Sequence, residues 1–117
     1  MQYDLKSKNL ELTPEIHDMV EGIMKDLGKL TQNMGESIFA DVEVGRTDLH
    51  HQSGDIYRAE INISVPGKKE VLRAEGIEKN ILFALTKAKD DMQRNIKRYK
   101  GRFRTKRIEE GVKYKGV

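Results

Sequence analysis

Seven apolar residues recur every three or four positions between Ile77 and Tyr99, and this periodicity constrains the fold more than any other feature of the chain. They are Ile77, Ile81, Leu85, Ala88, Met92, Ile96 and Tyr99. In an α-helix this spacing places all seven on one stripe about 100° wide, which is enough to pack against a sheet. The sequence therefore predicts a long amphipathic helix over residues 77–100, and Gly101 allows it to end.

A shorter helix is predicted near the N-terminus. Thr13 suits the N-cap, Pro14 the first helical position, and Glu15 the positive end of the helix dipole. The apolar stripe that follows consists of Ile16, Val20, Ile23, Leu27 and Leu30. The methionines expected in the core or at its flank are Met19, Met24 and Met34.

Three stretches alternate apolar and polar residues with a period of two, as strands with one buried face do, and a fourth is predicted as the returning strand of a hairpin. They cover residues 3–6, 38–44, 57–65 and 70–75. Pro66 and Gly67 predict a tight turn that joins the last two stretches into a hairpin. The element order is β-α-β-β-β-α. The predicted fold class is therefore α+β: a four-stranded sheet with two helices packed on one face, similar to a double-stranded-RNA-binding domain.

Composition narrows the class of protein. The 117 residues suffice for one domain, predicted over residues 1–100, with a flexible basic C-terminal tail over residues 101–117. The chain has no cysteine, which excludes a disulfide scaffold, a thiolate zinc site and a cysteine nucleophile. No apolar run approaches the roughly 18 residues of a membrane span, and Met1–Tyr3 does not begin a signal or transit peptide. We therefore expect a bacterial cytoplasmic protein with no membrane partner.

Charge is unevenly distributed along the chain. The net charge is only +3, but residues 87–107 contain ten Lys and Arg against two Asp, so this segment carries +8 and the rest of the chain −5. A basic segment gains free energy from counterion release on a polyphosphate, whereas an acidic one does not. The asymmetry indicates a nucleic-acid partner. The alternative is a solvated basic helix that has no partner.

No group of residues has the spacing of a catalytic or metal site. His50–His51 are adjacent on a predicted loop, where neighbours rarely chelate one metal, so solvated histidines are expected. The pairs Asp90–Asp91 and Glu109–Glu110 point about 100° apart on a helix and do not converge on one substrate. Gly67–Lys69 belongs to a hairpin turn and not to a phosphate-binding loop. We expect no enzyme, no metal and no cofactor.

The outward face of the predicted helix over residues 77–100 has the features of an RNA-binding surface. Its basic residues, which would follow a phosphate backbone over about five turns, are Lys79, Lys87, Arg94, Lys97 and Arg98. Phe83 lies on the same face, where stacking on a base and packing against a neighbouring loop are the two alternatives. Lys25 and Lys29 lie away from the apolar stripe of the first helix and extend the basic surface across both helices.

Four short motifs occur along residues 1–100. They are SKNLELTP at residues 7–14, YRAEI at 57–61, LRAE at 72–75 and MQRNIKRYK at 92–100. Together they resemble the ribosome hibernation-promoting factor family, which includes protein Y. The resemblance implies binding to the small ribosomal subunit and the whole ribosome in the channel used by mRNA and tRNA. It also implies competition with both RNAs, so that idle ribosomes are held inactive by steric occlusion.

The resemblance further implies which residues contact small-subunit rRNA. By position these are Lys29, Lys79, Lys87, Arg94, Lys97, Arg98 and Lys100. The predicted rRNA-binding set also includes Lys25, Phe83 and Arg102. Family members commonly begin the second helix with Asp-Met-Tyr, where this chain has Asn80–Leu82, and Phe83 is the neighbouring aromatic. Long family members append a dimerisation domain, so a chain ending at Val117 is expected to be a short form that is monomeric off the ribosome.

Two other functions are compatible with the same sequence. One is a general RNA-binding or RNA-chaperone module that uses the same basic surface without ribosome specificity. The other is a protein-interaction domain of the sigma-modulation type, whose basic tail docks an acidic partner. Cosedimentation with small subunits, binding to unrelated duplex RNA, and RNA affinity at physiological salt separate the three.

Overall fold

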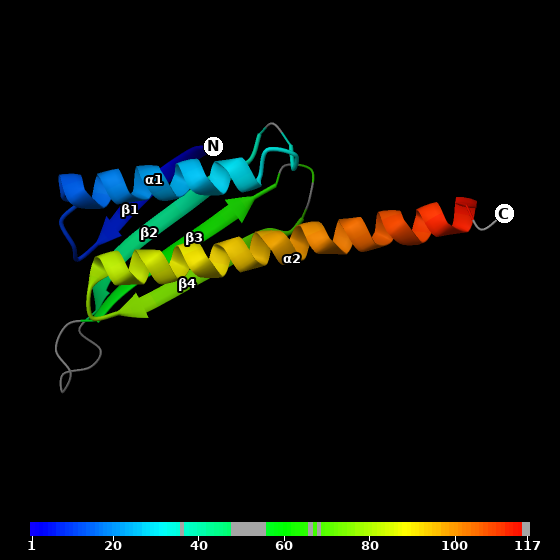
Figure 1. Cartoon of the computed structure of the whole chain (residues 1–117). Coiled ribbons are helices and arrows are strands. Elements are labelled where there is room, and N and C mark those ends of the chain that lie inside the picture. The colour runs from blue at the N-terminus through cyan, green and yellow to red at the C-terminus, as the bar shows by residue number, and fades with distance from the viewer. Residues whose placement is uncertain (36, 48–55, 66, 68, 116–117) are drawn as a thin grey trace.

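Six elements follow one another in the order β-α-β-β-β-α, as the periodicities predict (Figure 1). The computed structural model describes residues 1–35, 37–47, 56–65, 67 and 69–115, with side chains as far as Arg102. The elements are β1 (Gln2–Lys8), α1 (Pro14–Leu30), β2 (Phe39–Thr47), β3 (Ile56–Ser64), β4 (Val71–Glu78) and α2 (Ile81–Lys115). Pro66 of the predicted hairpin turn lies outside the described residues.

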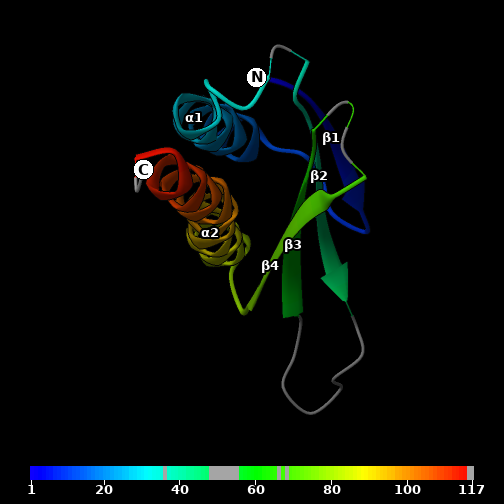
Figure 2. The ribbon, with the colours of Figure 1, turned by 90° about the vertical axis from the view of Figure 1, so that its right-hand side faces the viewer.

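The four strands form one sheet in the order β1-β2-β3-β4. β1 is parallel to β2, as the crossover through α1 requires, and the other two pairs are antiparallel. Both helices cover the same face of this sheet and leave the other face open (Figure 2). The predicted α+β class and element order are thus confirmed. The likeness to a double-stranded-RNA-binding domain stays a prediction.

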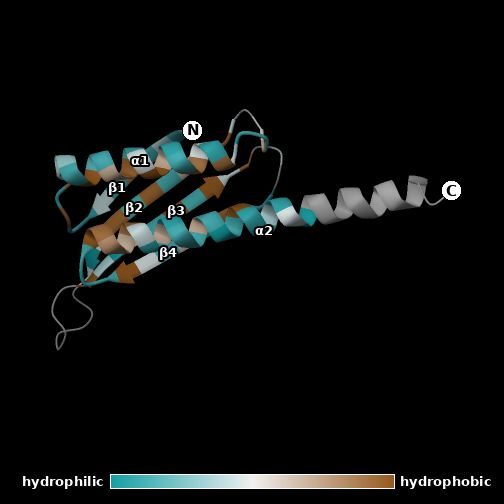
Figure 3. Ribbon diagram, viewed as in Figure 1, coloured by the Kyte–Doolittle hydropathy of each residue, from teal (hydrophilic) through white to brown (hydrophobic). Residues whose placement is uncertain are grey.

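α1 begins where the sequence predicts. The backbone N–H of Ile16 donates to Thr13 Oγ1 at 3.3 Å, and Pro14 occupies the first helical position. The residues that α1 buries against the sheet are Ile16, Val20, Ile23, Met24 and Leu27. The partly buried residues packed against this core include Met19, Leu30 and Met34. Apolar residues on the inner sides of the helices and of the sheet are brown in Figure 3.

α2 begins later than the sequence predicts. Ile77 does not extend the helical stripe. It lies in β4 opposite Arg58, with 50% of its surface exposed. The helix starts at Ile81, because the N–H of Leu82 donates to Asn80 Oδ1 at 2.7 Å, an N-cap contact. From Leu85 to Tyr99 the other predicted stripe residues are buried.

α2 also ends later than predicted, and this part of the expectation is wrong. The helix passes through Gly101 and continues to Lys115 (Figure 1). A glycine inside a helix costs about 1 kcal/mol relative to alanine, which does not by itself stop a helix. The residues that follow are mainly Arg, Lys and Glu, all good helix formers, and no proline interrupts them. The domain boundary at residue 100 and the flexibility of residues 101–117 stay predictions.

Candidate nucleic-acid interface

Seven of the ten predicted RNA-contacting residues gather at one end of the helical layer. α1 and α2 lie side by side and run in the same direction, so their C-terminal halves lie at the same end (Figures 1 and 2). The seven are Lys25, Lys29, Arg94, Lys97, Arg98, Lys100 and Arg102. We call them the basic patch. Six are exposed and Lys100 is half-buried.

Most of the basic patch has no carboxylate partner among the described side chains. Arg102 Nη2 lies 3.1 Å from Glu70 Oε2, with its guanidinium 5.5 Å from the ring centre of Tyr99. Arg94 Nη2 lies 3.8 Å from Asp91 Oδ1, a loose pair. The patch residues that form no ion pair with any described carboxylate are Lys25, Lys29, Lys97, Arg98 and Lys100. Their charges are therefore available to phosphates.

One ion pair joins the two helices beside the patch. Lys89 Nζ on α2 donates to Asp26 Oδ2 on α1 at 2.6 Å. This hydrogen bond and the charge of Lys89 lower the pKa of Asp26, and the charges of Lys29 and Lys25 lower it further. The Asp26 carboxylate thus lies in a positive local potential that several side chains create.

The other three predicted residues lie at the opposite end of the layer. Lys79 precedes α2 and is not on the helix as predicted. Lys87 Nζ contacts Glu78 Oε1 at 2.5 Å, and the resulting hydrogen bond and charge lower the pKa of Glu78. Phe83 exposes 65% of its surface, so little of its ring is covered by the described residues. These three residues lie nearer the start of α2 than the basic patch does.

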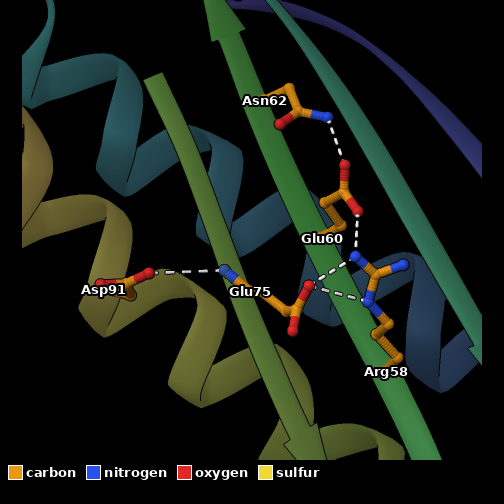
Figure 4. A network of polar contacts seen from close by, with 5 residues as sticks. All are labelled: Arg58, Glu60, Asn62, Glu75 and Asp91. Carbon is orange, nitrogen blue, oxygen red and sulfur yellow. Dashed lines mark hydrogen bonds and ion pairs between the residues drawn. The ribbon is translucent and has the colours of Figure 1, made fainter. Parts of the chain in front are cut away.

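α2 is held on the sheet by two side chains that the sequence analysis did not single out for this role. The backbone N–H of Glu75 donates to Asp91 Oδ2 at 3.4 Å (Figure 4), and Asn95 Nδ2 donates to the carbonyl of Arg73 at 2.6 Å. Both contacts use backbone groups of β4, whose other edge pairs with β3. The signal was present in the sequence: residues four apart share a helix side, so Asp91 and Asn95 face the same strand.

The open face of the sheet has a different character. Glu43, Glu60 and Glu75 lie side by side on neighbouring strands. Arg58 bridges the last two: its Nη2 contacts Glu60 Oε2 at 2.6 Å and its Nε donates to Glu75 Oε2 at 2.9 Å (Figure 4). The hydrogen bond to Glu75 and the surrounding carboxylates raise the pKa of Arg58. On this face Arg58 is therefore neutralised by its two carboxylate partners.

The structure does not test the prediction that His50–His51 are solvated loop residues. His50–His51 lie outside the described residues, and His17 is exposed on α1. Within the described part of the chain, no three His, Asp or Glu side chains are grouped to hold a metal ion. No helix in that part is long and apolar enough to span a membrane.

Comparison with known protein families identifies the family of the chain. Residues 3–104 match the sequence profile of the family described as Sigma 54 modulation protein / S30EA ribosomal protein. The chain belongs to this family. The match begins in β1 and ends at residue 104 within α2, so it includes all or part of each of the six elements. The resemblance inferred from the four motifs is confirmed.

Two curated relatives carry the name ribosome hibernation promotion factor. The one from Bacillus subtilis is 26% identical over 111 residues, which are 95% of this chain and 54% of the relative. The one from Deinococcus radiodurans is 27% identical over 107 residues, 92% of this chain and 53% of the relative. The chain thus spans about half the length of the curated relatives it matches.

Solved structures agree on the fold. The crystal structure of the Thermus thermophilus Protein Y N-terminal domain is 25% identical and superposes with a TM-score of 0.65. That match covers 85% of this chain and 99% of the domain. A structure described as a ribosomal subunit interface protein from Coxiella burnetii has a TM-score of 0.62 at 11% identity, over 86% of this chain and 99% of the other. The second similarity concerns the fold alone.

Proposed function

We propose that this protein is a ribosome-associated translation inhibitor that binds rRNA of the small subunit in the channel used by mRNA and tRNA. It holds idle ribosomes inactive by occupying that channel, so it makes and breaks no covalent bond and needs no cofactor. The observation that carries the proposal is the basic patch: seven cations on two adjacent helices, most of them unpaired. Membership of the family and the names of the two relatives support the ribosome as the partner.

The binding step follows from the electrostatics of the patch. Unpaired Lys and Arg side chains displace counterions from RNA phosphates, and the released ions drive association at low salt. Because the cations are mounted on helices packed against a sheet, little conformational entropy is lost on binding. A rigid cationic body of this kind excludes tRNA and mRNA from any site it fills. Inhibition is thus competition with tRNA and mRNA for one binding site on the ribosome. It takes place in the bacterial cytoplasm, where ribosomes are found.

Phe83 and the two cations near it have a separate part in the proposal. The ring is mostly exposed, at the start of α2 and away from the core. Stacking on an unpaired base contributes about 1–3 kcal/mol to binding. An exposed aromatic ring such as that of Phe83 is available for this stacking. We place Phe83, with Lys79 and Lys87, at the margin of the rRNA contact and the basic patch at its centre.

Charge reversal within the patch tests the proposal. The double variant Arg94→Glu/Arg98→Glu is expected to lose cosedimentation with vacant small subunits and keep its fold, since both side chains are exposed and outside the core. The control is Lys6→Glu/Lys8→Glu, which makes the same charge change on exposed positions of β1. Sucrose gradients at two salt concentrations, each with circular dichroism, make the measurement. Equal loss in both variants, or in neither, contradicts the site.

Competition separates ribosome-specific binding from general RNA binding. Excess deacylated tRNA is expected to release the protein from small subunits, because the two share one channel. A protein that stays bound in the presence of tRNA, and binds an unrelated duplex RNA equally well, is a general RNA-binding module.

A further inference from the structure

Charge along the helical layer is polarised from one end to the other. The first half of α1, residues 14–22, has three acidic residues and no Lys or Arg: Glu15, Asp18 and Glu21. All three side chains are exposed. The second half carries Lys25 and Lys29 of the basic patch. Asp18 and Lys25 are seven residues apart, which is about 10 Å along a helix and about one Debye length at moderate salt. Glu21 lies about one turn before Lys25, so the sign of the charge changes along α1 within that turn.

The cations near the acidic half are largely offset by carboxylates. Lys87 is paired with Glu78. Lys79 lines a surface pocket of about 380 Å³ between the starts of the two helices, and Glu11 and Glu15 line the same pocket. Both helix N-termini open at this end and would by themselves attract anions. Glu11 and Glu15 place negative charge beside these N-termini and oppose that attraction.

Stabilisation of α1 does not explain all of these carboxylates. A negative charge stabilises a helix through its dipole only within about the first turn. Pro14 is the first helical residue, so Glu15 lies in that turn, but Asp18 and Glu21 lie beyond it. Neither of the latter two forms an ion pair among the described residues. Their position beside an RNA-binding patch calls for another role.

We infer that the acidic half of α1 repels RNA phosphates, so that the RNA backbone crosses α1 only at its C-terminal half, where Lys25 and Lys29 lie, and in one orientation. This inference rests on the proposed function and adds to it a specificity element made of Asp18 and Glu21. Along α1, the protein binds RNA phosphates with the C-terminal half and repels them from the N-terminal half. RNA that would lie lengthwise along both helices is rejected.

Charge reversal of the acidic residues tests the repulsion. The variant Asp18→Lys/Glu21→Lys is expected to bind a short duplex RNA about tenfold more tightly at low salt and to bind small subunits no better than the wild type. The control is Asp4→Lys/Asp41→Lys, the same charge change on exposed, paired positions of β1 and β2. The control is expected to gain less than about threefold. Equal gains in the two variants would overturn the inference, because net charge alone would then explain them.

Directed cleavage locates the RNA directly. The chain has no cysteine, so an iron chelate can be attached at one introduced thiol: His17→Cys in the acidic half, or Gln32→Cys just after α1 at the basic end. Both positions are exposed. Hydroxyl radicals from Gln32→Cys are expected to cut bound small-subunit rRNA strongly, and those from His17→Cys weakly. Equal cutting overturns the inference while leaving the proposed function intact. Failure of the unmodified protein to bind small subunits refutes both.

Discussion

Gly76 determines how closely α2 approaches the sheet. A Cβ at this position would lie 2.0 Å from the carbonyl oxygen of Ala84 and 2.9 Å from the backbone N of Ala88. These are backbone atoms of α2, which cannot move aside as the end of a flexible side chain can. The residue therefore has to be glycine for a steric reason, since its backbone does not adopt a positive φ. The height of the basic patch above β4 depends on this contact.

Gly76→Ala is expected to lower the free energy of unfolding by about 3 kcal/mol or more, because the helix has to move off the strand. The control is Gly22→Ala on α1, where an added Cβ meets no atom within 4 Å. That change is expected to raise stability by up to about 1 kcal/mol through helix propensity. Urea unfolding followed by circular dichroism measures both. A Gly76→Ala protein as stable as the wild type would contradict the packing of α2 described above.

The exposure of the site residues was predictable, but their partners were not. Lys97 and Arg98 lie off the apolar stripe, so helical geometry alone places them on the surface. The partners of Lys87 and Arg102 are Glu78 and Glu70, which depend on how α2 packs across β4. A periodicity indicates which side of a helix is buried, but it does not indicate which strand residues lie beside that helix.

The element boundaries of α2 show the same distinction. Ile77 fits the helical stripe and also fits the alternation of a strand, and the pairing of β4 with β3 decides in favour of the strand. Gly101 is a plausible C-terminus by propensity alone, yet the helix continues through it. By contrast, the N-cap at Thr13 depends on residues next to each other in the sequence, and this prediction is confirmed. Features that depend on neighbouring residues, such as an N-cap, are therefore predicted correctly from the sequence. Boundaries that depend on whether a residue joins a strand or a helix are not.

Through Asp91 and Asn95, α2 hydrogen-bonds backbone groups at the unpaired edge of β4. Replacing both by alanine is expected to lower stability by about 1–2 kcal/mol, the usual value of two exposed hydrogen bonds. It also leaves backbone groups of β4 free to pair with another chain, so dimers are expected at high concentration. Urea unfolding and size-exclusion chromatography provide the measurements. Asp90→Ala is the control, since Asp90 is exposed and contacts no described partner. A stable monomer for the double variant would contradict the covering role.

At the scale of the whole molecule, the placement of α1 relative to α2 creates the basic patch. The sheet holds both helices on one face (Figure 2). The Lys89–Asp26 ion pair joins the two helices to each other. Each helix alone presents cations to only part of an RNA groove. Side by side, they present them over a surface two helices wide. The pair is therefore a structural link, and it uses a lysine that is then unavailable to phosphate.

Lys89→Met is expected to remove a stability contribution that depends on pH. The pKa of Asp26 is lowered from its ordinary value of 3.8, chiefly by its hydrogen bond to Lys89. A group whose pKa is lower in the folded state stabilises the fold above its ordinary pKa and loses that contribution as the pH falls through the folded value. The advantage of the wild type over Lys89→Met should thus be constant from about pH 7 to pH 5 and shrink below 3.8. Because Asp26 is exposed, the advantage is small.

Urea unfolding across this pH range makes the measurement, and small-subunit binding connects it to function. Lys89→Met/Asp26→Asn, which removes both charges of the pair and leaves the net charge unchanged, is expected to bind almost as well as the wild type. Lys97→Met, which removes an unpaired cation of the basic patch, is expected to bind more weakly while showing no change in the pH dependence of stability. If instead the two variants bind equally, or if the advantage over Lys89→Met persists unchanged at the lowest pH, the ion pair does not hold the helices as described.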